Sequence, residues 1–153
     1  MGWFNYYGLI EIAVILIPNI IVAATDKQAY ANKFDNKALI VTEQIGRYGC
    51  MAFMTFNIPY TYFGFWFDNA LTVYLAVGGA LLFVYCLGWI IFRKGNGLVK
   101  MLWLSVTPTL LFVFCGITVA SVPLIVCATV FGAGHITVSV KNADRTNIKG
   151  EHL

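Results

Sequence analysis

The longest stretch without a formal charge, residues 101–140, limits what this chain can fold into. It contains no Asp, Glu, Lys or Arg, and a membrane-spanning helix needs only about 20 apolar residues. The stretch is therefore long enough for two spans rather than one. A turn within it is predicted where Ser121 is a favourable N-cap and Pro123 suits a first helical turn. We therefore expect a turn at 120–123 between spans at about 101–119 and 122–140.

The rest of the chain has the composition of a membrane protein. Of its 153 residues, 59% are hydrophobic and only 11% are charged, against about 25% charged in an ordinary soluble domain. A surface this poor in charge cannot face water, so the lipid bilayer is the expected solvent and partner. The first apolar run lacks the features of a removable signal, and we expect it to remain as a span. Three further spans, at about 7–24, 48–67 and 70–92, complete an all-α, five-helix transmembrane bundle that forms one domain, 1–140.

The lysines and arginines support this count and give the bundle a direction. All ten lie in three groups, which follow the first, third and fifth expected spans: Lys27, Lys33, Lys37 and Arg47; Arg93, Lys94 and Lys100; Lys141, Arg145 and Lys149. With five spans these groups share one side of the membrane, and basic residues favour the cytoplasmic side. We therefore expect a multi-pass protein of a cytoplasmic or plasma membrane, with its N-terminus outside and its C-terminus in the cytoplasm.

Two cytoplasmic segments are expected, a loop at 25–47 and a short polar tail at 141–153. The loop is predicted to become helical from about Asn36 onward, where Glu43 and Arg47 stand four residues apart in the order that stabilises a helix. The tail is polar and short, and we expect it to be disordered.

Prolines interrupt three of the expected spans, each near a polar residue: Pro18 beside Asn19, Pro59 after Asn57, and Pro108 between Thr107 and Thr109. Proline removes a backbone donor and leaves a carbonyl one turn earlier without its bond. Neighbouring hydroxyl or amide side chains can satisfy backbone groups in the membrane, and we expect this of the two threonines. An asparagine amide has more hydrogen-bonding capacity than one carbonyl needs. Both asparagines are therefore candidates for lining a functional site as well as for packing.

Asn57 lies near the middle of the expected span 48–67, within the aromatic sequence TFNIPYTYFGFW. If that span is one kinked helix, a polar stripe runs along it and faces protein or water rather than lipid. The stripe consists of Cys50, Asn57, Tyr60, Gly64 and Asp68, with Tyr62 in the same outer half. The neighbouring aromatic residues are expected to form a belt at the outer interface.

Glu11 and His135 are the carboxyl and the imidazole that fall within the expected spans. Intramembrane carboxylates usually mark a functional site, but Glu11 is only about one turn from the outer surface and could also reach headgroup water. Because no Lys or Arg lies in any expected span, a buried Glu11 is expected to be protonated or bonded to hydroxyls such as those of Tyr60 or Tyr62. His135 suits either a hydrogen-bonded packing role or proton transfer near neutral pH.

Several classes of function find no support in the sequence. There is no long basic run interleaved with aromatic residues, which argues against nucleic-acid binding. One intramembrane histidine is too few for a bis-histidine haem, and no cluster of three or four zinc ligands is visible. The four cysteines lie on four different spans without a Cys-x-x-Cys motif, which disfavours a thiol oxidoreductase. No catalytic triad, carboxylate pair or phosphate loop is visible, so no enzyme activity, cofactor or metal is predicted.

Three hypotheses remain open. In the first, the protein binds or transports a small amphipathic or cationic molecule, and its small size implies a homo-oligomer. Its cavity is expected to open outward between the first two spans, lined by Glu11, Asn57, Tyr60, Tyr62 and Asp68, with Asn19 and His135 on the inner side. In the second, it is a non-catalytic interaction protein, either an accessory subunit of a larger membrane complex or an immunity-type protein, whose partner surface is the loop 25–47. In the third, which has the least support, it is a membrane enzyme acting on lipids.

Overall fold

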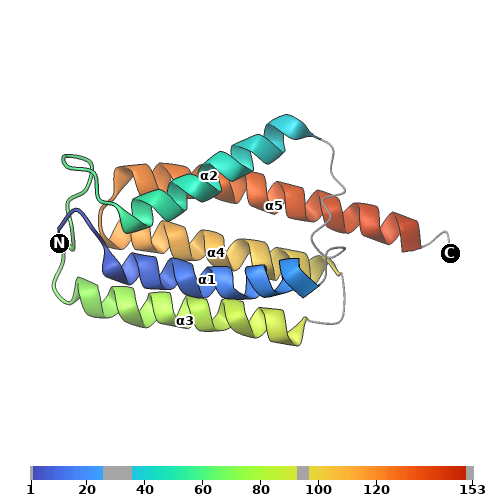
Figure 1. Ribbon diagram of the computed structural model, residues 1–153, viewed down its shortest axis with the longest axis horizontal. Helices are drawn as coiled ribbons and strands as arrows, with labels where there is room; N and C mark the ends of the chain where they lie inside the picture. The colour runs from blue at the N-terminus through green and yellow to red at the C-terminus, as the bar shows by residue number, and fades with distance from the viewer. Residues whose placement is uncertain (1, 26–35, 93–96, 151–153) are drawn as a thin grey trace.

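The computed structural model describes residues 2–25, 36–92 and 97–150, and five α-helices account for most of them (Figure 1). The helices are α1 (Tyr6–Thr25), α2 (Lys37–Thr55), α3 (Ala70–Ile91), α4 (Leu98–Thr118) and α5 (Val122–Gly150). Consecutive helices run in opposite directions along one bundle. The predicted all-α class with five helices is therefore confirmed.

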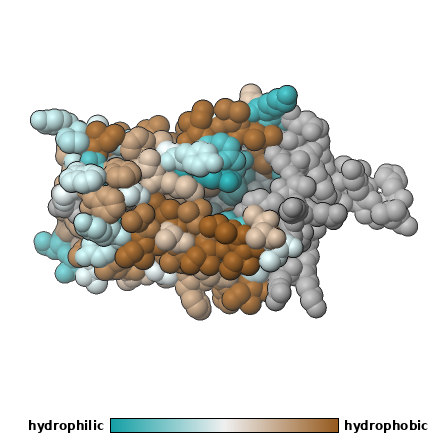
Figure 2. Space-filling model, viewed as in Figure 1, coloured by the Kyte–Doolittle hydropathy of each residue, from teal (hydrophilic) through white to brown (hydrophobic). Residues whose placement is uncertain are grey.

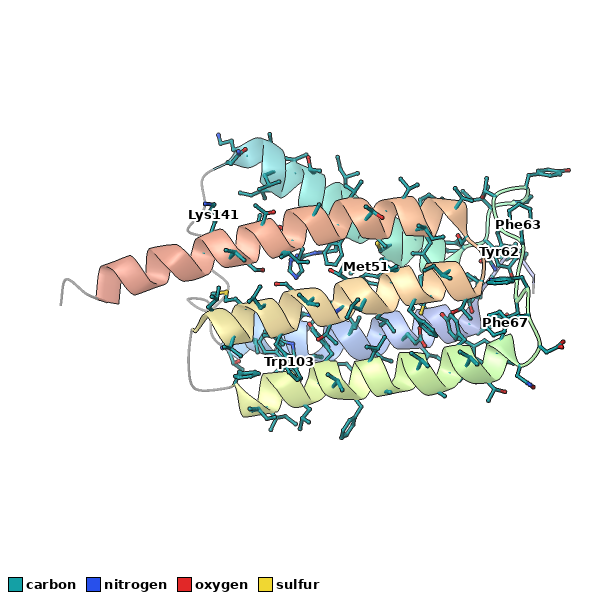
Figure 3. All side chains as sticks on the ribbon, turned by 180° about the vertical axis from the view of Figure 1, so that it is seen from behind. Met51, Tyr62, Phe63, Phe67, Trp103 and Lys141 are labelled. Atoms are coloured by element: carbon teal, nitrogen blue, oxygen red, sulfur yellow. The ribbon has the colours of Figure 1, made fainter. Side chains whose placement is uncertain are left out.

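The helices pack in an order that differs from their order in the chain. α2 packs along α5, α5 along α4, and α4 along α3, while α1 contacts both α3 and α2. Residues 2–5, the connection 56–69 and the turn 119–121 gather at one end of the bundle, which we call the aromatic end. The opposite end, which we call the basic end, holds the starts of α2 and α4. Figure 3 labels Tyr62, Phe63 and Phe67 at the aromatic end, with Trp103 and Lys141 toward the basic end.

Four of the helices are long and apolar enough to cross a membrane: α1, α3, α4 and the part of α5 from Val122 to Asn142. The surface of α1 agrees, since Ile10, Ile17 and Ile20 are exposed where lipid tails can cover them. On the face drawn in Figure 2, apolar surface covers much of α1, and a hydrophilic patch lies between α1 and α2. These helices indicate a multi-pass membrane protein.

α2 begins before the expected second span. The prediction of helix from about Asn36 is confirmed, because the side chain of Asn36 accepts a 3.2 Å hydrogen bond from the backbone N–H of Leu39 and caps the helix. Of the expected loop 25–47, residues 26–35 lie outside the described part of the chain, and Lys37 already belongs to α2.

α2 also ends well before the expected span does, at Thr55. No helix covers 56–69, so the prediction of a kinked helix carrying a polar stripe is wrong. The backbone explains the difference, because Tyr60, Gly64 and Asn69 have φ angles of 67°, 83° and 59°, which a right-handed helix does not contain. The aromatic sequence is a connection across the end of the bundle rather than part of a span.

Backbone hydrogen bonds hold this connection against the turn between α4 and α5. The N–H of Gly64 donates to the carbonyl of Val119 at 3.1 Å, and the N–H of Val122 donates to the carbonyl of Thr61 at 3.1 Å. The indole N–H of Trp66 adds a 2.9 Å bond to another carbonyl of the same region. These backbone groups are thus satisfied without a helix.

The start of α5 agrees with the sequence prediction, and its end does not. The N–H of Ile125 donates to the carbonyl of Ser121 at 3.1 Å, so Ser121 occupies the predicted N-cap position. The expectation of a disordered tail is wrong for 141–150, because α5 continues to Gly150. Once a helix is nucleated, each further residue adds a hydrogen bond at little cost, even where the sequence is polar.

Pro108 lies inside α4 with the local hydrogen bonds that the sequence predicts. The hydroxyl of Thr107 donates to the carbonyl of Trp103 at 2.7 Å, and the hydroxyl of Thr109 donates to the carbonyl of Ser105 at 2.8 Å. Both hydroxyls are therefore satisfied within their own helix, as expected.

Glycines allow α2 and α5 to approach closely. A Cβ added at Gly46 would lie 2.6 Å from the backbone nitrogen of Phe131, which is closer than side-chain carbons pack against backbone. A Cβ added at Gly134 would lie 3.0 Å from the Cβ of Glu43. Small residues at such positions let helix backbones meet in a membrane, where lipid provides no hydrophobic drive for helix association.

Replacement of Gly46 by alanine should destabilise the bundle, because the new methyl group collides with the backbone of α5. We expect a loss of about 1–3 kcal/mol, the usual cost of overpacking, measured as a lower thermal midpoint in detergent. Gly79→Ala is the matched control, since a Cβ there meets nothing within 4 Å. Equal stability of the two variants would contradict the close α2–α5 contact.

Candidate functional site

Glu11 is buried inside the bundle rather than exposed to lipid headgroups. It is 5% exposed, and its Oε2 lies 3.3 Å from the Sγ of Cys115 on α4, which donates a hydrogen bond to it. Its Oε1 lies against Gly78 of α3, where a Cβ would collide with it. The absence of a side chain at Gly78 thus makes room for the carboxyl group between α1, α3 and α4.

The walls around Glu11 are aromatic and polar but carry no charge. Tyr74 of α3 is 0% exposed and lies beside Glu11 and Cys115, yet its hydroxyl makes no hydrogen bond of ordinary geometry to a described residue. The ring of Phe65 packs edge-on against Tyr74 with centroids 5.7 Å apart. Asn5 is also buried and approaches Tyr74 from the aromatic end. We call Asn5, Glu11, Phe65, Tyr74 and Cys115 the Glu11 site.

No cation balances Glu11 within the described ranges of the chain. Both ion pairs found there involve Glu43, whereas the polar partners of Glu11 are a thiol and a phenol. An unpaired carboxylate in an apolar interior is so costly that the group is either protonated or paired with a bound cation. The Glu11 site can therefore hold a proton or a cation.

A second polar cluster lies between α2 and α5, toward the basic end. The Nδ1 of His135 lies 2.8 Å from the Oε1 of Glu43, and the guanidinium of Arg47 donates to the same oxygen. His135 also stacks on the ring of Phe131 with centroids 4.7 Å apart. Glu43 is buried, but two nitrogen partners satisfy its carboxylate. This cluster suits a packing role, one of the two roles predicted for His135.

Asn19 makes a third polar contact between helices. Its Nδ2 donates to the carbonyl of Ile15 at 2.7 Å, one turn back in α1, and lies 2.7 Å from the hydroxyl of Tyr85 on α3. It is about two turns from Glu11 along the helix. Asn19 therefore satisfies a backbone carbonyl near Pro18 and links α1 to α3, and it does not contact Glu11.

The other predicted site residues lie at the aromatic end and do not meet Glu11. Asn57 is buried, and its Nδ2 donates to a backbone carbonyl near the N-terminus at 2.9 Å. Tyr60 is 97% exposed, and Asp68 is exposed as well. Tyr62 is half-buried, with a hydroxyl that has no partner among the described residues. The fold separates these side chains from Glu11 because their segment is not helical, and the phenol beside Glu11 belongs to another helix.

Asn5, Tyr74 and Cys115 are members of the site that the sequence did not reveal. Tyr74 and Cys115 lie in uniformly apolar helices, where periodicity cannot distinguish the wall of a site from ordinary packing. Asn5 did carry a usable signal, because it stands before the first helix where an N-cap is expected. Its Oδ1 accepts a 3.2 Å hydrogen bond from the backbone N–H of Gly8.

An apolar groove of about 440 Å³ lies between α4 and α5, whereas the sequence places a cavity between the first two spans. Small and β-branched side chains line the groove: Thr109, Val113, Ala128, Thr129, Gly132, Ala133, Ile136 and Thr137. None of these side chains is ionisable. The groove suits lipid tails and offers no charge to a cation.

No protein-family model, curated protein or solved structure matches this chain. Within the part of the chain that the structure describes, no group of three or more His, Cys, Asp or Glu side chains could hold a metal ion. The chemistry available at the Glu11 site is that of a buried carboxyl, a phenol and a free thiol, with the ring of Phe65 packed against the phenol.

The two buried glutamates should respond differently to loss of their charge. Glutamine resembles a protonated glutamate, so Glu11→Gln should leave the thermal midpoint nearly unchanged. Glu43→Gln removes the charge that Arg47 and His135 contact. We expect it to lower the free energy of unfolding by about 1–3 kcal/mol, which is less than the loss when one partner of a fully buried ion pair is removed. Thermal unfolding of both variants in the same detergent measures the difference. An equally large loss in both would mean that Glu11 is ionised and paired.

Proposed function

We propose that all five helices cross the membrane, with the aromatic end outside and the basic end in the cytoplasm. α2 runs along the length of the bundle (Figure 1), although it is less apolar than the other spans. Its charged Glu43 and Arg47 contact residues of α5, while Val41, Ile45 and Tyr48 are exposed. An outward face of this kind suits lipid, and basic residues favour the cytoplasmic side.

A membrane-impermeant thiol reagent tests this orientation. Tyr60→Cys, at the aromatic end, should react in intact cells, and Lys141→Cys should react only after the membrane is permeabilised. The unsubstituted chain provides the background from its own cysteines. The reverse pattern would overturn the orientation, and reaction of both variants in intact cells would overturn the five crossings.

We also propose that the protein binds a small amphipathic cation, balances its charge with Glu11, and moves it across the membrane. The observation that carries this proposal is the burial of Glu11 without a cationic partner among the described residues. Tyr74 and Phe65 provide the π faces that attract organic cations. The Tyr74 hydroxyl, which lies beside Glu11, adds a hydrogen-bonding group to the site. This proposal places the site between α1, α3 and α4, whereas the sequence predicts it between the first two spans.

In this proposal, Glu11 holds a proton while the bundle is closed. When a cation binds, the O–H bond of Glu11 breaks, the proton leaves to water, and the carboxylate pairs with the cation. One carboxyl group cannot serve both at once, so occupancy by the proton and occupancy by the cation exclude each other. That exclusion is what an exchange of the two across a membrane requires. Five spans are few for a transporter, and the proposal therefore includes a homo-oligomer.

Calorimetric titration with tetraphenylphosphonium tests the proposal on purified protein in detergent. We expect tighter binding at alkaline than at acidic pH. At acidic pH about one proton should be released per bound cation, because Glu11 must ionise to bind it. Glu11→Gln should abolish binding. Asp68→Asn is the matched control, since it removes an exposed carboxylate at the aromatic end. Unchanged binding in Glu11→Gln, or affinity independent of pH, would contradict the role of Glu11.

A second candidate function, a non-catalytic interaction protein, is favoured by the aromatic end. Trp3, Tyr60, Phe63 and Trp66 are all exposed there. Aromatic side chains are enriched in protein–protein interfaces, so this surface suits a membrane-protein partner better than the loop 25–47 that the sequence favours. In that case the Glu11 site serves packing alone.

Co-purification separates the two candidates. An interaction protein should retain a stoichiometric partner in mild detergent, and the double variant Tyr60→Ser, Phe63→Ser should lose it while Glu11→Gln retains it. A chain that binds the cation through Glu11 and carries no partner supports the first candidate and contradicts the second.

A further inference from the structure

We infer that residues 2–5 are a gate that controls access to Glu11 from the aromatic end, an inference that rests on the proposed function. These residues precede α1 and lie at the same end of the bundle as the connection 56–69 (Figure 1). The last of them, Asn5, both caps α1 and belongs to the Glu11 site. Movement of this segment therefore changes the site directly.

A short antiparallel pairing holds the gate closed. Phe4 pairs with Phe56 in an isolated β-bridge. The backbone N–H of Asn5 donates to the carbonyl of Thr55 at 2.8 Å. The gate is thus attached to the end of α2 by a few hydrogen bonds of the kind that water can replace.

Asn57 acts as the latch of this pairing. Its backbone N–H donates to the carbonyl of Trp3 at 2.8 Å, and its Nδ2 donates to the carbonyl of Gly2 at 2.9 Å. One residue therefore supplies two of the hydrogen bonds that hold the segment. This explains why an asparagine stands in an otherwise aromatic and apolar stretch.

Two features indicate that the latch can be released. The Oδ1 of Asn57 is buried without a hydrogen-bond partner among the described residues, and opening to water would satisfy it. Trp3 stacks on Phe56 with centroids 6.0 Å apart but remains exposed, so it is not locked into the bundle. The closed state is held by local contacts rather than by core packing.

The structure beneath the gate is tightly packed. Gly8 lies so close to the carbonyl of Met54 that a Cβ would collide with it, which joins α1 to α2 just below the gate. Cys115, which bonds to Glu11, is 0% exposed. Asn5 of the gate approaches Tyr74, and Tyr74 lies beside Cys115. We therefore expect movement of residues 2–5 to open a path to Cys115 from the aromatic end, so this thiol reports on the gate.

The rate of Cys115 alkylation tests the inference on the full-length protein in detergent, with no cation added. The protein is treated with N-ethylmaleimide, and peptide mass mapping follows the label at Cys115 separately from the other cysteines. Asn57→Ala should be labelled roughly five- to tenfold faster than the wild type, the change expected from one lost hydrogen bond. Asn19→Ala is the matched control, since it removes an asparagine contact near the other end of α1 and should be labelled at the wild-type rate.

A disulfide across the bridge supplies the second test. Antiparallel partners in the arrangement of Phe4 and Phe56 have Cα atoms about 4.5 Å apart, within the range of a disulfide. The oxidised Phe4→Cys, Phe56→Cys protein should be labelled at Cys115 more slowly than wild type, also when combined with Asn57→Ala, and reduction should reverse this.

A wild-type labelling rate in Asn57→Ala would overturn the gate, as would equal acceleration in Asn19→Ala or no protection by the disulfide. These measurements report access to the site without any ligand. Loss of the proposed function shows instead in the cation titration of Glu11→Gln, so the two proposals fail separately.

Discussion

The close contact between α2 and α5 is the interaction on which the rest of the bundle depends. Gly46 and Gly134 bring the two backbones together, and the charges of Glu43 and Arg47 meet α5 instead of the surroundings. Most of the large side chains exposed on α2 are apolar or aromatic as a result: Val41, Ile45 and Tyr48. The composition of α2 alone does not identify it as a membrane span, but this packing leaves it an outward face that lipid can cover. Its end at Thr55 in turn supports the pairing that covers the aromatic end.

The two buried carboxyl groups of this bundle have opposite surroundings. Glu43 has a guanidinium and an imidazole on the same oxygen, so its burial is compensated within the protein. Glu11 has a thiol, a phenol and the backbone of Gly78, none of which can neutralise it. A buried acid whose charge no described residue compensates is the kind of group that can bind a proton or a cation. That contrast is the reason why the proposed cation site is placed at Glu11.

The sequence predicted those elements that depend on local chemistry. The break at Ser121, the start of a helix near Asn36 and the hydroxyl bonds around Pro108 each involve residues within one turn of each other, and all three predictions were correct. The prediction of the second span was wrong because an apolar, aromatic stretch was interpreted as helix. In the structure, residues with positive φ angles, such as Tyr60 and Gly64, turn this stretch across the end of the bundle. A long apolar run indicates that a segment prefers lipid or the protein interior to water, but it does not specify the backbone conformation.

The sequence by itself determined the all-helical class, the four strongly apolar helices and the positions of Glu11, Asn57 and His135 along the chain. It could do so because span length, capping and charge are properties of contiguous residues. Only the tertiary structure decided that Glu11 meets Tyr74 and Cys115, and that His135 meets Glu43. A helix that is apolar on every side has no periodicity to show which face turns inward, so its partners are set by packing against the other helices.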